Sequence, residues 1–177
     1  MPAAPPVPAI GPATEHPERP VPRVTGLDHA TLVAGDLGAA RAFYGELLGM
    51  REVPRPAFTF GGLWFAAAES GPPVLHVIES HGPGTPRCEL EGPGSGPPGI
   101  NEDGRAKSSR GPHLALRCDD PRTFEPRLEA AGATFVHRAK RRPDGATQVF
   151  VCDPDGHVIE LCSAPAAESR LSAADPA

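Results

Sequence analysis

Four side chains with metal-binding chemistry recur at matched intervals along the 177-residue chain. His29 and His76 are 47 positions apart, and His113 and Glu160 are separated by the same interval. A shift of 84 residues places the first pair on the second. Neutral imidazoles and an ionised carboxylate bind borderline divalent ions without further activation. Three imidazoles and one carboxylate at repeat-equivalent positions therefore predict a metal site.

The strands that must carry these residues have an aliphatic face and a ligand face. Alternate side chains of a strand point to opposite faces, so His29 points away from Leu32 and Glu160 points away from Ile159. The other two candidates follow the same alternation. Any one of them alone would be interpreted as a half-buried strand residue with ordinary hydrogen bonds. Four at equivalent positions favour metal binding, on the face of a sheet whose other face packs on helices.

Each half of the chain predicts a βαβββ module. Asp36 is expected to cap a helix over 36–48, and Asp120 one over 120–131, in which Pro126 predicts a kink or a late start. The expected strands are 27–33, 51–53, 60–67 and 74–79 in the first half, and 114–118, 134–137, 147–152 and 158–162 in the second. We therefore predict an α+β fold in which two βαβββ modules form a curved mixed sheet around a metal-binding cavity.

Proline and glycine mark the boundaries of these modules. The chain holds 24 Pro and 20 Gly, concentrated near its start and in its middle. A long Gly/Pro-rich segment without apolar periodicity is either functional or a disordered connector. The expected divisions are a disordered tail (1–22), module 1 (23–80), a linker (81–112), module 2 (113–163) and a second disordered tail (164–177), with 23–163 forming one domain.

Composition and charge exclude several functional classes. No apolar run approaches the ~20 residues that span a bilayer, and the first twenty residues lack the basic start and apolar segment of a secretory signal. The formal net charge is −5, and no long basic stripe is available for a nucleic-acid backbone. The four cysteines show no CxxC spacing and are expected to be reduced thiols. We therefore predict a cytoplasmic protein that binds neither membranes nor nucleic acid.

The chain resembles the vicinal oxygen chelate superfamily, which contains glyoxalases, bleomycin resistance proteins and dioxygenases. LDHATLVAGDLGAARAFYGELLGM is similar to the opening strand and helix of the family, and VFVCDPDGHVIEL to its seventh and eighth strands. RPAFTFGGLWF, VLHVIES and HLALRCDD are similar to the third, fourth and fifth strands. The resemblance covers 24–80 and 112–163, and its fourth strand matches the glyoxalase I-like subset.

This resemblance implies His29, His113 and Glu160 as metal ligands. It places His76 in the fourth, more variable position, where bacterial glyoxalase I enzymes usually carry a glutamate linked to proton transfer. The implied cofactor is a divalent ion (Ni, Zn, Fe, Mn or Co), and the implied partners are a small-molecule substrate and a second copy in a homodimer. The metal site of this fold lies between modules, within one chain or across the dimer.

The expected activity is lyase or isomerase chemistry of the glyoxalase I-like type. The substrate would be chelated through two neighbouring oxygens, with His76 and Glu160 as catalytic residues and His76 as a base where it is not a ligand. One alternative is a non-haem iron dioxygenase that uses the same two histidines and carboxylate. Another is a metal-free drug-binding or self-resistance protein of the same fold.

Further residues are candidates for substrate contacts. Phe60 and Trp64 share a strand face and could wall the pocket, while Gln148 could donate a hydrogen bond to substrate; core packing or exposure is the alternative for each. A basic cluster is expected to be a solvated hairpin loop, with an anionic substrate as the alternative interpretation; it comprises Arg138, Lys140, Arg141 and Arg142. The remaining histidines are not expected to join the metal site; they are His16, His81, His137 and His157.

Overall fold

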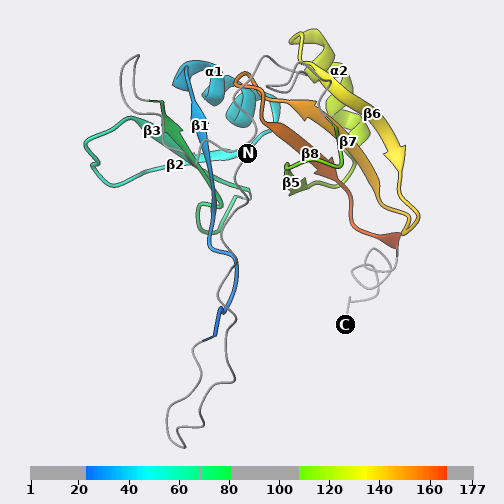
Figure 1. The fold of residues 1–177 in the computed structure, drawn as a ribbon, viewed down its shortest axis with the longest axis horizontal. Helices are drawn as coiled ribbons and strands as arrows, with labels where there is room; N and C mark the ends of the chain where they lie inside the picture. Colours follow the sequence, from blue (N-terminus) through cyan, green and yellow to red (C-terminus); the bar gives the residue numbers. More distant parts are fainter. Residues whose placement is uncertain (1–22, 68, 81–107, 167–177) are drawn as a thin grey trace, which may run out of the picture.

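The computed structural model describes residues 23–67, 69–80 and 108–166. Both predicted tails, apart from the first residues of the second, lie outside the described residues, as do most of the predicted linker, His16 and His81. The described residues form two four-stranded mixed sheets with a few short helices (Figure 1). This confirms the predicted α+β fold of βαβββ modules, and it shows one four-stranded sheet in each module.

Module 1 has the strand order β1-β4-β3-β2, in which β1 runs parallel to β4 and the other pairs are antiparallel. Its elements are β1 (Ala30–Ala34), α1 (Leu37–Arg41), the π-helix η1 (Ala42–Leu47), β2 (Arg51–Val53), β3 (Gly62–Ala66) and β4 (Leu75–Glu79). A parallel pair needs a crossover connection, and α1, η1, β2 and β3 supply it here.

Module 2 repeats this topology with the order β5-β8-β7-β6 and a parallel β5–β8 pair. Its elements are β5 (Leu114–Arg117), the 3-10 helix η2 (Pro121–Phe124), α2 (Glu125–Ala130), β6 (Phe135–Arg141), β7 (Thr147–Cys152) and β8 (Val158–Cys162). The sixth strand is longer than the predicted 134–137. The pairing of this strand with β7 continues to Arg141 and Thr147. Three of the four basic residues expected in a hairpin loop therefore lie in β6, namely Arg138, Lys140 and Arg141.

The helices begin where their capping residues predict. The Asp36 side chain accepts hydrogen bonds from the backbone N–H groups of Gly38 and Ala39, at 2.7 and 3.1 Å, and so satisfies two donors that have no partner within the helix. In module 2 the predicted late start is observed. A 3-10 turn precedes α2, and Pro126 stands in the first turn of α2, where its missing N–H has no helical partner to lose.

The first strand starts later than predicted. β1 begins at Ala30 rather than Leu27, and Leu27 is 90% exposed. Its parallel partner β4 pairs first at Leu75, and the backbone N–H of Ala30 donates to the carbonyl of Val74. Pro73 comes directly before this point and has no N–H to extend the ladder. His29 therefore lies one residue outside the sheet.

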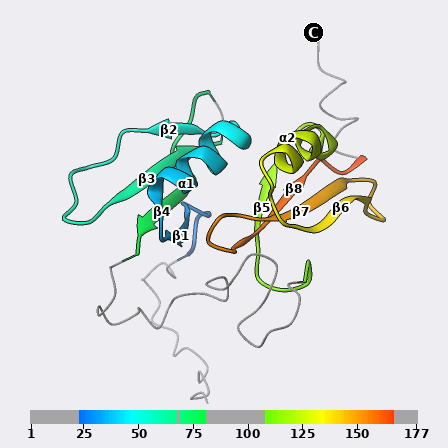
Figure 2. The ribbon, with the colours of Figure 1, turned by 90° about the horizontal axis from the view of Figure 1, so that it is seen from above.

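The two modules share one hydrophobic core. It combines aliphatic-face residues of both sheets, such as Leu75 and Val77 from β4 and Ile159 and Leu161 from β8. The helices meet in the same region, where Arg127 of α2 donates a hydrogen bond to the carbonyl of Glu46 in η1. Figure 2 shows the modules side by side, with β6 on the outer side of module 2. Because the aliphatic faces meet in this core, the ligand faces of both sheets point away from it.

A buried polar contact joins the modules at the DPDG turn between β7 and β8. The Tyr44 hydroxyl lies 2.6 Å from a carboxylate oxygen of Asp153, and both residues are buried. Nearby, the backbone N–H of Gly35 donates to Asp155 at 2.7 Å. Burial raises the pKa of Tyr44 well above its ordinary value, and the neighbouring Asp153 carboxylate adds to this rise. The phenol therefore stays protonated and donates.

Candidate metal centre

The first pair of predicted ligands forms a stack of rings on the ligand face of module 1. The ring centroids of His29 and His76 are 3.8 Å apart with an interplanar angle of 22°. Trp64 stacks on His76 at 4.2 Å and 7°. β3 and β4 produce this contact, because Trp64 pairs directly with His76 in the antiparallel register and both side chains share a face.

The electrostatic surroundings favour a neutral His76. Burial lowers the pKa of this imidazole below its ordinary value, and the adjacent His29 lowers it further. His29 is oriented by a residue that sequence reasoning missed, since its Nδ1 lies 2.6 Å from a carboxylate oxygen of Asp28. An ionised carboxylate only accepts hydrogen bonds, so Nδ1 carries the proton. The Nε2 lone pair of a neutral His29 is left for a ligand, the arrangement found around metal-binding histidines.

The second pair of predicted ligands is in direct contact. His113 Nε2 lies 3.1 Å from Oε2 of Glu160, and His113 Nδ1 lies 2.8 Å from the carbonyl oxygen of Gly111. A carbonyl only accepts, so Nδ1 donates to Gly111. In the neutral imidazole, the Nε2 lone pair would then face a carboxylate oxygen, which is also an acceptor. A cation between the two atoms, either a proton or a metal ion, resolves this conflict.

Glu160 is a buried carboxylate with unused hydrogen-bonding capacity. Its side chain is 7% exposed, and its Oε1 atom is buried without a hydrogen-bond partner among the described residues. The nearest cation is the guanidinium of Arg142, 3.8 Å from Oε1, which also binds Asp144 at 2.7 Å. A buried carboxylate is stable only when it is paired or bound to a metal. The donor set and this spare oxygen fit a divalent ion held by His113 and Glu160.

The four predicted ligands are brought together as two pairs rather than as one cluster. Within residues 23–67, 69–80 and 108–166, no group of three or more His, Cys, Asp or Glu side chains is close enough to hold a metal ion. The aliphatic faces of both sheets contribute to the shared core, so each pair lies on the opposite face of its own sheet. Each module of one chain thus presents half of the predicted site.

The predicted substrate residues have different surroundings. Trp64 lies beside His76, as described above, whereas Phe60 precedes β3 and stacks on Phe58 at 5.2 Å. Gln148 is half-buried in β7. Its alternation with Phe150, which pairs with Glu160, places Gln148 on the ligand face of module 2.

Two of the histidines set aside from the sequence are also placed by the structure. His137 pairs with Phe150 in β6, and their ring centroids are 4.6 Å apart, so it lies on the ligand face of module 2 rather than near a loop. Strand parity could have located it, had β6 been given its full length. His157 binds Asp153 at 2.9 Å and belongs to the contact between modules.

Comparison with known proteins shows which family this chain belongs to. Residues 26–161 match the model of the glyoxalase/bleomycin resistance protein/dioxygenase superfamily. The chain belongs to this superfamily. The match spans both ligand pairs and the linker between the modules, so the resemblance expected from the opening strand, the fourth strand and the DPDG turn is confirmed.

Three known proteins match this chain at low sequence identity. It is 26% identical to glyoxylase I 4 of Arabidopsis thaliana over 143 residues, covering 79% of this chain and 71% of that protein. A glyoxalase family protein from Bacillus anthracis is 27% identical, with a TM-score of 0.54 over 80% of this chain and 97% of that one. The fosfomycin resistance protein FosX of Listeria monocytogenes shares the fold at 18% identity and a TM-score of 0.54, covering 82% and 98%.

The sequence led us to expect no membrane-spanning segment. In the part of the chain that the structure describes, no helix has the length and apolar character needed to cross a membrane.

Proposed function

We propose that this superfamily member is a divalent-metal-dependent enzyme that carries out lyase or isomerase chemistry on a small substrate chelated through two neighbouring oxygens. The observation that carries the proposal is the 3.1 Å contact between His113 Nε2 and the buried Glu160 carboxylate, in which a neutral imidazole would place a lone pair against a carboxylate oxygen. A cytoplasmic location, expected from the sequence, is part of this proposal.

The complete site needs residues from both modules. His29 and His76 would supply two imidazoles, and His113 and Glu160 would supply the third imidazole and the carboxylate. Bound to these residues, the ion would act as a Lewis acid that stabilises negative charge on a substrate oxygen. The identity of the ion, among Ni, Zn, Fe, Mn and Co, is decided by the reconstitution experiment below.

The chain's own side chains then control protons and water around the substrate. Trp64 covers one face of the His76 ring and so keeps water from that side. A neutral His76 that is not bound to metal can accept a proton from the substrate. Gln148, on the ligand face of module 2, can donate a hydrogen bond to a substrate oxygen.

The site would form across a homodimer. In one chain the two ligand pairs lie on sheet faces opposite the common core, and within the described residues they do not form one group. A second copy can place its His113–Glu160 pair against the His29–His76 pair of the first, and by two-fold symmetry the dimer then holds two equal sites.

Metal analysis coupled to activity reconstitution tests the proposed chemistry. Protein made in metal-replete medium should contain close to one equivalent of a single divalent ion per chain, and adding ions one at a time to stripped protein should restore activity with one or two of them. Glu160→Gln should lower metal affinity more than about tenfold. The matched control is Glu129→Gln, which removes an exposed carboxylate paired with Arg138 and should bind metal normally. Less than half an equivalent of metal in the unaltered protein would refute the proposal.

The same experiment separates the alternative functions. Oxygen uptake with a catechol panel and the iron-loaded protein would identify a dioxygenase, and ligand binding by a protein that takes up no metal would identify a metal-free binding protein. Either result contradicts the lyase or isomerase proposal.

Mixing two inactive variants tests whether the site crosses the dimer. His29→Ala and Glu160→Ala each damage both sites of their own homodimer. In a mixed dimer with a shared site, both substitutions fall in one site and the other site is intact. Random exchange of subunits should therefore restore about a quarter of the metal-binding sites. If each site lies within one chain, mixing restores none.

A further inference from the structure

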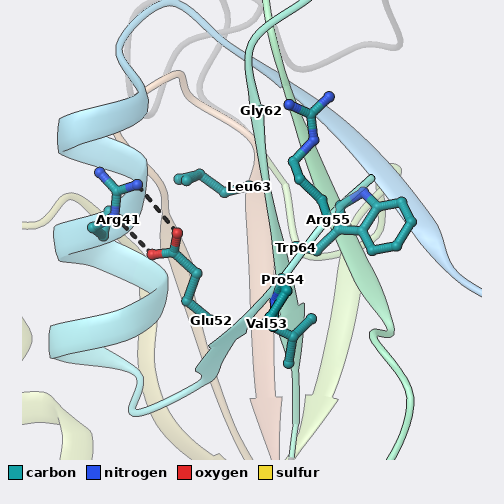
Figure 3. Close-up of a pocket in the computed structure, with 8 residues that line it drawn as sticks. All are labelled: Arg41, Glu52, Val53, Pro54, Arg55, Gly62, Leu63 and Trp64. Atoms are coloured by element: carbon teal, nitrogen blue, oxygen red, sulfur yellow. Dashed lines mark hydrogen bonds and ion pairs between the residues drawn. The ribbon is translucent and has the colours of Figure 1, made fainter. Parts of the chain in front are cut away.

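A pocket of about 400 Å³ lies at the edge of module 1, where β2 ends and β3 continues (Figure 3). The last pair of the ladder is Val53–Trp64, and Pro54 follows with no N–H to extend it. The chain leaves the sheet there and returns at Gly62. We call this cavity the edge pocket. Its lining residues are Arg41, Glu52, Val53, Pro54, Arg55, Gly62, Leu63 and Trp64.

The charges in the edge pocket leave one cation uncompensated. Arg41 binds the Glu52 carboxylate through two hydrogen bonds of 2.7 and 3.2 Å, so these charges neutralise each other. Arg55 is the other charged lining residue, and in the described part of the chain no carboxylate lies within ion-pair distance of it. Figure 3 shows the Arg41–Glu52 pair on one side of the pocket and Arg55 beside Trp64 on the other.

The Arg55 guanidinium is held in place with donors to spare. It lies 4.9 Å from the centroid of the Phe58 ring and 5.3 Å from that of Phe60, and one terminal nitrogen donates to the Phe60 carbonyl at 3.0 Å. Its Nε is buried and has no hydrogen-bond partner among the described residues. A guanidinium has five N–H donors in a planar fork that fits a carboxylate. A partly buried fork whose terminal nitrogens keep unused donors is suited to bind an anion.

Trp64 supplies a flat apolar wall and a connection to the metal half-site. The same ring that lines the edge pocket stacks on His76, which in turn stacks on His29. A ligand in the pocket that contacts Trp64 therefore touches the ring on which His76 stacks. Val53, Pro54 and Leu63 supply the other apolar side chains of the lining.

We propose that the edge pocket binds a small organic carboxylate with a flat apolar body, its carboxylate on Arg55 and its body against Trp64. That this group is the non-reacting end of the enzyme's substrate rests on the proposed function. Binding itself depends on neither metal nor dimer, because all the lining residues belong to one module of one chain.

The single tryptophan of the chain makes the edge pocket directly observable. Fluorescence titration of the full-length protein, both as purified and after metal removal, would compare phenylacetate with its neutral isostere phenylacetamide. Phenylacetate should change Trp64 emission saturably, with a Kd in the millimolar range or tighter, and the amide should bind at least about tenfold more weakly. Equal affinity for the two, or no saturable binding of phenylacetate, would overturn the proposal.

Charge variants identify the residue responsible. Arg55→Gln should weaken phenylacetate binding about tenfold or more, and Arg41→Gln should also weaken it because the Glu52 carboxylate is then uncompensated. Glu52→Gln should not weaken it. Arg122→Gln, which removes an exposed guanidinium paired with Asp120, is the matched control and should bind as the unaltered protein does. Normal binding by a folded Arg55→Gln protein contradicts the assignment.

The proposal for the edge pocket and the proposal for the metal site can be refuted independently of each other. Glu160→Gln should leave phenylacetate binding unchanged, and Arg55→Gln should leave the metal content unchanged. Loss of metal in Glu160→Gln with normal phenylacetate binding would support both assignments, whereas phenylacetate binding without any metal uptake would leave the edge pocket standing and refute the proposed function.

Discussion

Replacing Tyr44 by phenylalanine should weaken the connection between the two modules without creating a cavity. The substitution removes one hydroxyl, which lies 2.6 Å from Asp153. The ring contacts with Phe43 and Phe65, at centroid distances of 5.1 and 5.7 Å, can remain. The predicted effect is therefore the loss of one buried hydrogen bond to a carboxylate rather than a packing defect.

The structure bounds the size of this effect. A hydrogen bond to a charged group contributes about 1.5–3 kcal/mol to stability. Asp153 keeps three other donors, namely the backbone N–H groups of Asp155 and His157 and the His157 ring, so its carboxylate is not left unpartnered. We therefore expect the lower part of the range, a loss of about 1.5–2 kcal/mol in the free energy of unfolding.

Urea denaturation at fixed protein concentration measures this loss. With a slope of about 2 kcal/mol per molar urea, the midpoint should fall by about 0.75–1 M. A double-mutant cycle with Asp153→Asn should give a coupling free energy of about 1 kcal/mol or more. A Tyr44→Phe variant within about 0.5 kcal/mol of the unaltered protein, or a cycle without coupling, would refute the role assigned to this contact.

Three further predictions follow from single residues. Gly62→Ala should destabilise the fold by about 1–3 kcal/mol in urea denaturation, because the new Cβ would lie 2.6 Å from the backbone oxygen of Val77; an unchanged midpoint would contradict it. Burial raises the pKa of the Cys118 thiol to about 11, so alkylation at pH 8, followed by mass spectrometry, should be about a hundredfold slower there than at an ordinary thiol; equal rates would contradict it. Burial also raises the pKa of Asp155, so folding favours its protonated form and its contribution to stability declines as the pH rises above about 4. Relative to Asp155→Asn, the unaltered protein should therefore lose free energy of unfolding between pH 4 and pH 7, and a gain would contradict the assigned shift.

Much of the secondary structure followed from local chemistry. Asp36 and Asp120 cap helices because their side chains satisfy N–H groups that no helix can satisfy, and Pro126 belongs at a helix start for the same local reason. The beginning of β1 was less predictable. It depends on where its parallel partner β4 begins, after Pro73, and this partner is about 45 residues away.

The candidate site was predictable to the level of residue pairs. Strand alternation placed His29 and His76 on one face, and His113 and Glu160 on another, and the structure brings each pair into contact. Asp28 was missed because an exposed carboxylate beside a histidine carries no periodic signal. The edge pocket was not predicted, because its residues belong to three separate elements. No residue spacing in the sequence indicates where the hydrogen bonding between two strands ends.

The sequence by itself determined the repeat, the two βαβββ modules and which face of each sheet carries the candidate ligand residues. These features depend on alternation, capping and chain breaks, which act over a few residues. The tertiary structure alone decided how the modules are placed. It packs both aliphatic faces into one core, because burying them together removes more apolar surface from water than either module can alone. Within the described residues the two candidate ligand pairs do not form one group, which is why we propose that a second copy completes the metal site.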